Sequence, residues 1–74
     1  TLAEDLVTRG VRQIDEILAE MRGCLEASGG HVDYIAVVDA ETLRPVAEIS
    51  KKILVATAVS YGDVRLIDNR EITP

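Results

Sequence analysis

Three kinds of side chain in this sequence could carry chemistry: one histidine, one cysteine, and a group of carboxylates near the C-terminus. His31 follows Ser-Gly-Gly at the start of an apolar run, and a catalytic base also needs a partner that positions it. We therefore expect His31 to be an exposed loop histidine. Cys24 falls on the apolar side of a predicted helix, where we expect a buried, unreactive thiol rather than a nucleophile.

The carboxylates of Asp63, Asp68 and Glu71 lie close in sequence to Arg65. Such a group could bind a metal ion or act as general acid and base. Turn formation and surface charge explain the same residues more simply. The segment Ser28–His31 lacks both the lysine and the following helix of a phosphate-binding loop. The sequence therefore assigns no catalytic, cofactor-binding or metal-binding residue.

Composition and charge exclude several classes of function. The 74 residues can form one domain at most, and their net charge is −5. That charge argues against binding nucleic-acid phosphates, and the scarcity of aromatic residues argues against stacking on single strands. A single cysteine allows no internal disulfide and no thiolate zinc site, which favours a reducing, cytoplasmic location. No apolar run approaches the ~20 residues that cross a membrane, so we expect no membrane partner.

Apolar spacing predicts two helices in the first part of the chain. The first is short and ends at Gly10. Its apolar residues are Leu2, Leu6 and Val7. Apolar residues that recur every three or four positions predict a second, longer helix at about 12–28. Gly23 inside this helix costs about 1 kcal/mol relative to alanine, which a close approach by a neighbouring element would explain.

Segments rich in β-branched residues predict three strands, at His31–Asp39, Ile53–Tyr61 and Val64–Asn69. Gly62 and Asp63 join the last two strands as a hairpin. We therefore expect an α+β fold in which two N-terminal helices pack on a three-stranded, mainly antiparallel sheet. The result is a two-layer sandwich.

The connection between the first two strands, residues 40–52, is predicted to begin with a helical turn. Asp39 would cap this turn and Pro45 would end it. Leu43 and Val46 are expected to pack the connection onto the core.

Both faces of the predicted sheet are apolar, whereas a sheet with one wet face should alternate apolar and polar residues. The first strand is expected to place Val32, Tyr34, Ala36 and Val38 on one face and Asp33, Ile35, Val37 and Asp39 on the other. The second strand places Ile53, Val55 and Val59 on one face and Leu54, Ala56 and Ala58 on the other. Two helices can cover one face. Either residues 40–52 or a partner surface outside this chain would cover the second.

Two stretches, Val32–Val46 and Ile53–Asn69, resemble the C-terminal domain of the pantoate–β-alanine ligase (pantothenate synthetase) family. That family has a tyrosine-bearing strand, an Asp-x-x-Thr-Leu-x-Pro turn, an aliphatic strand, a glycine and Arg-Leu-Ile-Asp-Asn. The matching residues here are Tyr34, Asp39–Pro45, Gly62 and Arg65–Asn69. The likeness covers at least residues 12–72.

The resemblance implies that residues 1–74 are a single C-terminal lid domain of a larger two-domain ligase. The family condenses pantoate with β-alanine to pantothenate, using ATP and Mg²⁺ to form a pantoyl adenylate and releasing AMP and pyrophosphate. The family's N-terminal nucleotide-binding domain carries most ligand contacts, so we expect this chain alone to be inactive and to bind no cofactor. The full enzyme is expected to be a homodimer.

The resemblance places Arg65, Asp68 and Asn69 in the family's terminal motif, where we interpret them as structural residues that bond the hairpin end and the facing loops. One alternative stays open from the residues alone. The chain could be a stand-alone, non-enzymatic interaction module whose open sheet face binds another protein or itself.

Overall fold

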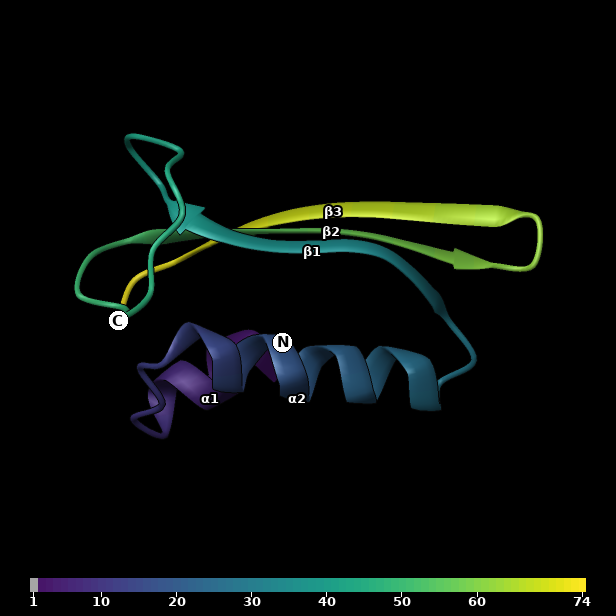
Figure 1. The fold of residues 1–74 in the computed structure, drawn as a ribbon, viewed down its shortest axis with the longest axis horizontal. Coiled ribbons are helices and arrows are strands. Elements are labelled where there is room, and N and C mark those ends of the chain that lie inside the picture. The colour runs from purple at the N-terminus through teal and green to yellow at the C-terminus, as the bar shows by residue number, and fades with distance from the viewer. Residues whose placement is uncertain (1) are drawn as a thin grey trace.

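The computed structural model describes residues 2–74, which form two helices followed by three strands. The helices are α1 (Leu2–Thr8) and α2 (Ile14–Ala27), and the strands are β1 (His31–Asp39), β2 (Ile53–Tyr61) and β3 (Val64–Ile72). Figure 1 shows the sheet as one layer and both helices together as the other layer. The predicted α+β two-layer fold is confirmed.

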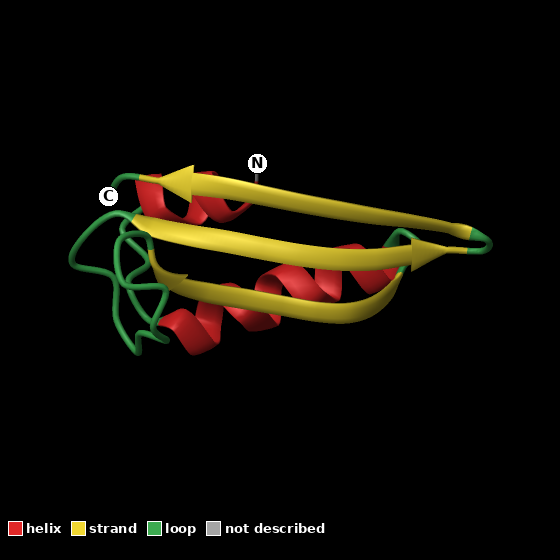
Figure 2. Ribbon diagram, turned by 90° about the horizontal axis from the view of Figure 1, so that it is seen from above, coloured by secondary structure: helices red, strands yellow, loops and turns green. Residues whose placement is uncertain are grey.

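The three strands form one antiparallel sheet in the order β1-β2-β3, with β2 in the middle (Figure 2). The tight turn between β2 and β3 places Gly62 at φ +61°, a conformation that glycine adopts without a steric penalty. β3 runs on to Ile72, beyond the predicted end at Asn69, because Arg70, Glu71 and Ile72 all pair with β2. Ile72 reaches the core and is 5% exposed.

The longer helix, α2, lies within the predicted range and turns Ile14 and Ile17 into the core. Two expectations for this helix are wrong. Cys24 is exposed, because it lines a groove between α1, α2 and the sheet that the neighbouring side chains do not fill. A Cβ added to Gly23 would have no neighbouring atom within 4 Å, so no close approach explains this glycine. The close approach occurs instead at Gly30, where a Cβ would come within 2.6 Å of Val59 Cγ1.

A β-bulge in β1 changes which side chains share a face. Val32 pairs with Val59 but Tyr34 pairs with Ala58, so Asp33 is an extra residue between the two pairs. Val32 therefore turns toward the helices and is buried, whereas we expected it to share the face of Tyr34. The Asp33 side chain turns to the opposite face, where it meets residues of β2 and β3.

The connection between β1 and β2 contains a turn but no helix. The Asp39 carboxylate accepts hydrogen bonds from the backbone N–H groups of Glu41 and Thr42 at 2.8 and 2.9 Å. Leu43 was expected in the core, yet it is 62% exposed with φ +60°. Val46 does pack against the core, as predicted.

The second half of this connection closes one end of the core. Ile49 is buried, and its N–H bonds the carbonyl of Arg12 at 2.8 Å. The Ile14 N–H bonds the carbonyl of Ala47 at 3.1 Å, which satisfies a free donor at a helix start that lacks a side-chain cap. These contacts lie at the helix layer and the sheet end. They leave most of the second sheet face uncovered.

The core lies between the helices and one face of the sheet. Its fully or nearly buried members are Ala3, Leu6, Val7, Ile14, Ile17, Val37, Ile49, Ile53, Val55 and Ile72. Both helices lie on the same side of the sheet (Figures 1 and 2). Of the two alternatives for the second face, residues 40–52 do not cover the whole face, because Tyr34 and Ile67 stay exposed, although the loop after β1 rises on this side at one end of the sheet (Figure 1).

Candidate functional site on the open face of the sheet

The face of the sheet that turns away from the helices is the candidate functional site, and we call it the open face. Strand pairing groups its members in rows across β1, β2 and β3. They are Tyr34, Ala36, Val38, Leu54, Ala56, Ala58, Ser60, Arg65, Ile67, Asn69 and Glu71. Tyr34 is 41% exposed and Ile67 61% exposed, and Ala58 between them is fully buried. The middle of the open face is therefore a continuous apolar surface.

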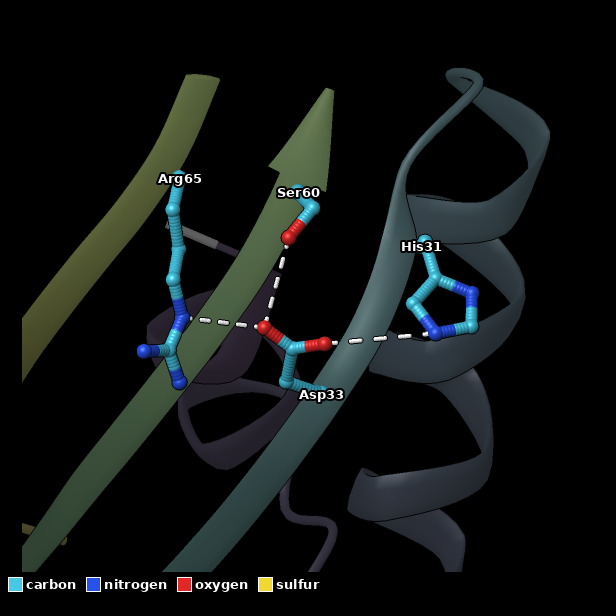
Figure 3. A network of polar contacts seen from close by, with 4 residues as sticks. All are labelled: His31, Asp33, Ser60 and Arg65. Atoms are coloured by element: carbon cyan, nitrogen blue, oxygen red, sulfur yellow. Dashed lines mark hydrogen bonds and ion pairs between the residues drawn. The ribbon is translucent and has the colours of Figure 1, made fainter. Parts of the chain in front are cut away.

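A polar network occupies one end of the open face (Figure 3). The Asp33 carboxylate accepts a bond from Arg65 Nε at 2.9 Å and one from Ser60 Oγ at 3.3 Å. Only Nε of the guanidinium makes this bond, so the pair is not bidentate. His31 Nε2 lies 3.9 Å from Asp33, which is too far for a hydrogen bond. The network therefore orients Arg65 more firmly than His31.

His31 does not have the setting of a catalytic base. Its side chain is 83% exposed, in agreement with the expectation of an exposed histidine. A general base needs a bonded partner that fixes its orientation, and Asp33 is out of bonding range. Cys24 is exposed as well, but Arg70, the cation that lines the same groove, is paired with Glu4 at 3.1 Å and so does not leave an unpaired positive charge beside the thiol.

An ion pair closes the opposite end of the open face. Lys52 Nζ lies 2.7 Å from the Glu71 carboxylate, and both side chains are about half exposed. The hydrogen bond and the charge of Glu71 raise the pKa of Lys52 above its ordinary value. Nearby, the N–H groups of Thr42 and Glu41 lower the pKa of Asp39 below its ordinary value. Both ends of the open face thus carry partnered charges.

The predicted group of carboxylates near the hairpin is not a cluster in space. Asp63 lies in the turn, Asp68 lines a groove on the helix side, and Glu71 pairs with Lys52 on the open face. Within residues 2–74, no three histidine, cysteine or acidic side chains are placed to hold a metal ion. Arg65 does bond across the sheet, but its partner is Asp33 of β1 rather than a facing loop.

A groove lies on the helix side near these residues. It has a volume of about 180 Å³ and lies between the start of α1, the second half of α2, the first half of β2 and the second half of β3. Pockets that bury small-molecule ligands usually measure about 300–1,000 Å³. The groove is too small for a nucleotide, so the open face, and not a pocket, is the functional candidate.

Sequence reasoning missed two members of the site, Asp33 and Ser60. Asp33 sits in an apolar run, and regular alternation through the bulge would place it on the helix side with Val37. Ser60 carried no signal, since serine near a turn is common. The open face itself was visible in the sequence as a second apolar set in the strand Ile53–Tyr61.

A family model described as pantoate-beta-alanine ligase matches residues 1–71. The chain belongs to the pantoate–β-alanine ligase family. Pantothenate synthetase of Thermosipho melanesiensis is 45% identical over 67 residues, which cover 90% of this chain and 24% of that protein. Pantothenate synthetase of Anaeromyxobacter dehalogenans is 43% identical over 67 residues, covering 90% of this chain and 23% of that protein.

A third relative is more similar over a shorter stretch. Pantothenate synthetase of Akkermansia muciniphila is 59% identical over 44 residues, which cover 60% of this chain and 16% of that protein. The chain spans about a quarter of the length of the ligases that match it over most of its residues. Within residues 2–74, no helix is both long and apolar enough to span a membrane.

Proposed function

We propose that this chain is the C-terminal lid domain of a pantoate–β-alanine ligase. The observation that carries the proposal is the family match over residues 1–71, to relatives about four times as long as the chain. The whole ligase would join pantoate and β-alanine as an amide. ATP would activate the pantoate carboxylate as an acyl adenylate with loss of pyrophosphate, and the amine of β-alanine would then displace AMP.

The described residues do not fit ATP and Mg²⁺. Residues 2–74 hold no set of carboxylates or histidines placed for a metal ion, and the groove of about 180 Å³ is too small for the nucleotide. No step of the reaction is therefore assigned to a side chain of this chain. The proposal places nucleotide chemistry on the rest of the ligase, in its N-terminal domain.

The role left to this domain is to cover the reacting centre. An acyl adenylate reacts with water as well as with an amine, so a ligase gains from closing a lid that excludes water. A sheet with helices on one face and an exposed apolar surface on the other suits that role, because one side stabilises the domain while the other side is free to cover. Tyr34 and Ile67 are the most exposed apolar side chains of that surface.

The test is to express the complete polypeptide that contains this chain and to supply it with ATP, Mg²⁺, pantoate and β-alanine. Production of AMP and pantothenate, dependent on both substrates, supports the proposal. The chain of residues 1–74 alone is expected to form neither product. A complete polypeptide without this activity would contradict the proposed function. Light scattering on the same preparation would test the further proposal that the full enzyme is a homodimer.

The open face also favours a second candidate, a stand-alone interaction module. Exposed contiguous apolar surface often marks a protein-binding site. Under this alternative, the protein that contains this chain would have no ligase activity, and its partner would bind through Tyr34 and Ile67. The product assay above separates the two candidates directly.

A further inference from the structure

We infer that the open face, together with the loop of residues 40–45, is the surface through which this domain docks on the rest of the ligase polypeptide. The inference rests on the proposed function and adds the face, the contact residues and the occupant. Figure 1 shows the loop after β1 rising on the side of the sheet away from the helices. The loop and the open face therefore border the same space.

Exposure of the apolar middle of the open face does not stabilise this chain. Tyr34 and Ile67 flank Ala58 in one row, and Ala36 and Ala56 continue the surface in the next row. Tyr34 and Ile67 close over Ala58, which is fully buried, so these two large side chains form the apolar surface that a partner would contact. On β3 itself, Ile67 is the apolar residue of the open face and lies between Arg65 and Asn69. On the helix side of β3, Arg70 pairs with Glu4 of α1.

Leu43 is an independent sign of docking on the same side. Its φ of +60° is unfavourable for a residue with a Cβ, at a cost of about 1 kcal/mol or more. Its side chain is 62% exposed, so burial within this chain does not offset that cost. A leucine that is both strained and exposed is explained if a partner surface buries its side chain.

The polar ends of the open face are suited to contact that forms and breaks. Asp33 with Arg65 at one end, and Lys52 with Glu71 at the other, are already paired within the domain. Docking therefore leaves no lone charge buried, and undocking leaves no lone charge to be hydrated. This arrangement of an apolar middle with a polar rim is typical of protein interfaces.

The area of the open face distinguishes between a tethered partner and a second copy. Three strands about 4.8 Å apart and about 30 Å long give a face of about 400 Å². Two such faces would bury about 800 Å², below the roughly 1,200 Å² of stable complexes between separate chains. A surface in the same polypeptide needs less area, because the tether raises its effective concentration. The matching ligases are long enough to supply such a surface.

The first test compares two tyrosines in the complete ligase. In this chain Tyr34 of the open face is exposed, while Tyr61 on the helix side is only half-buried and bonds Ser28 Oγ at 3.0 Å. Hydroxyl-radical labelling read by mass spectrometry measures the reactivity of each side chain. The inference predicts that Tyr34 reacts at least several-fold more slowly than Tyr61. Faster reaction of Tyr34 than of Tyr61 would overturn the inference. Protection of Tyr34 that disappears on dilution of the ligase would also overturn it, because it would show that a second copy covers the open face.

The second test changes the open face without touching the core. Ile67→Lys places a charge on the open face, and Ala19→Lys places the same charge on the exposed side of α2 as a matched control. In the complete ligase, we expect Ile67→Lys to lower kcat/KM about tenfold or more and to raise Tyr34 labelling, and the control to do neither. Equal activity of the two variants would overturn the inference.

The two tests separate failure of the inference from failure of the proposed function. An unaltered complete polypeptide that makes no pantothenate overturns the proposed function, and the inference falls with it. An active ligase in which Tyr34 stays more reactive than Tyr61 overturns the inference alone.

Discussion

The Asp33 carboxylate lies 2.9 Å from Nε of Arg65, although their strands are separated by β2. The bulge at Asp33 makes this contact possible, because it turns the side chain onto the open face, where Arg65 also lies. Ser60 of the intervening strand adds a bond to the same carboxylate. All three strands are thus joined by side chains at the end of the sheet near the hairpin (Figure 3).

Removing this charge pair should have only a small effect on folding. Asp33→Asn removes the attraction to Arg65, but both side chains are partly exposed, and such pairs contribute about 1 kcal/mol or less. We expect the free energy of unfolding in urea to fall by that amount in dilute buffer and by less in high salt. Glu71→Gln, which breaks the pair with Lys52, is the matched control and should behave alike. A loss of more than about 2 kcal/mol would show that the bulge depends on Asp33.

Two glycines should respond in opposite ways to alanine. At Gly30 the new Cβ would meet Val59 Cγ1 at 2.6 Å and the Leu25 carbonyl oxygen at 3.0 Å, so Gly30→Ala should destabilise by about 2 kcal/mol. At Gly23 no atom lies within 4 Å, so Gly23→Ala should stabilise α2 by up to about 1 kcal/mol. Urea unfolding of both variants measures this difference. Stabilisation by Gly30→Ala would contradict the packing of α2 on the sheet.

Stability in acid should depend on Asp39. Its pKa is lowered in the fold by the N–H groups of Thr42 and Glu41, so the ionised form stabilises the folded state. That contribution is complete above the ordinary pKa of 3.8 and is lost as the pH falls through the lowered folded pKa. Asp39→Asn keeps an oxygen acceptor without the charge. The stability difference from the unaltered chain should therefore shrink as the pH falls below about 4. A difference that is the same at all pH values would exclude a contribution from ionised Asp39.

Leu43 should show opposite effects on stability and on activity. Asparagine tolerates a positive φ better than leucine, so Leu43→Asn should raise the free energy of unfolding by about 1 kcal/mol. In the complete ligase the same change should lower activity, because it removes an apolar contact with the partner surface. Leu43→Ala is the control: it should lower activity equally and leave stability nearly unchanged. Full activity in both variants would show that Leu43 does not contact a partner.

The first two strands and the order of elements followed from the sequence because their signals are local. His31–Asp39 and Ile53–Tyr61 are β-branched runs with glycine or charged residues at their ends, and both strands occur at those bounds. The second helix was placed correctly to within two residues at its start and one at its end, because its period is long and regular. The open face was predictable because the strand Ile53–Tyr61 carries apolar residues on both of its faces.

The remaining features depend on tertiary contacts. The continuation of β3 through Arg70 and Glu71 depends on pairing with β2, and these charged residues alone do not predict a strand. The bulge at Asp33 leaves no trace in the alternation of side chains. Cys24 has the right period to be buried, yet it lines an open groove between α1, α2 and the sheet and stays exposed.

The central claim is that this domain covers the reacting adenylate by docking through its open face. The measurement that tests it most directly is the ratio of AMP to pantothenate formed by the complete ligase. An intact cover excludes water, so the unaltered ligase and the Ala19→Lys control should form the two products in equal amounts. Ile67→Lys should admit water to the adenylate and form more AMP than pantothenate. Equal amounts of the two products in Ile67→Lys, together with an unchanged rate, would contradict the claim.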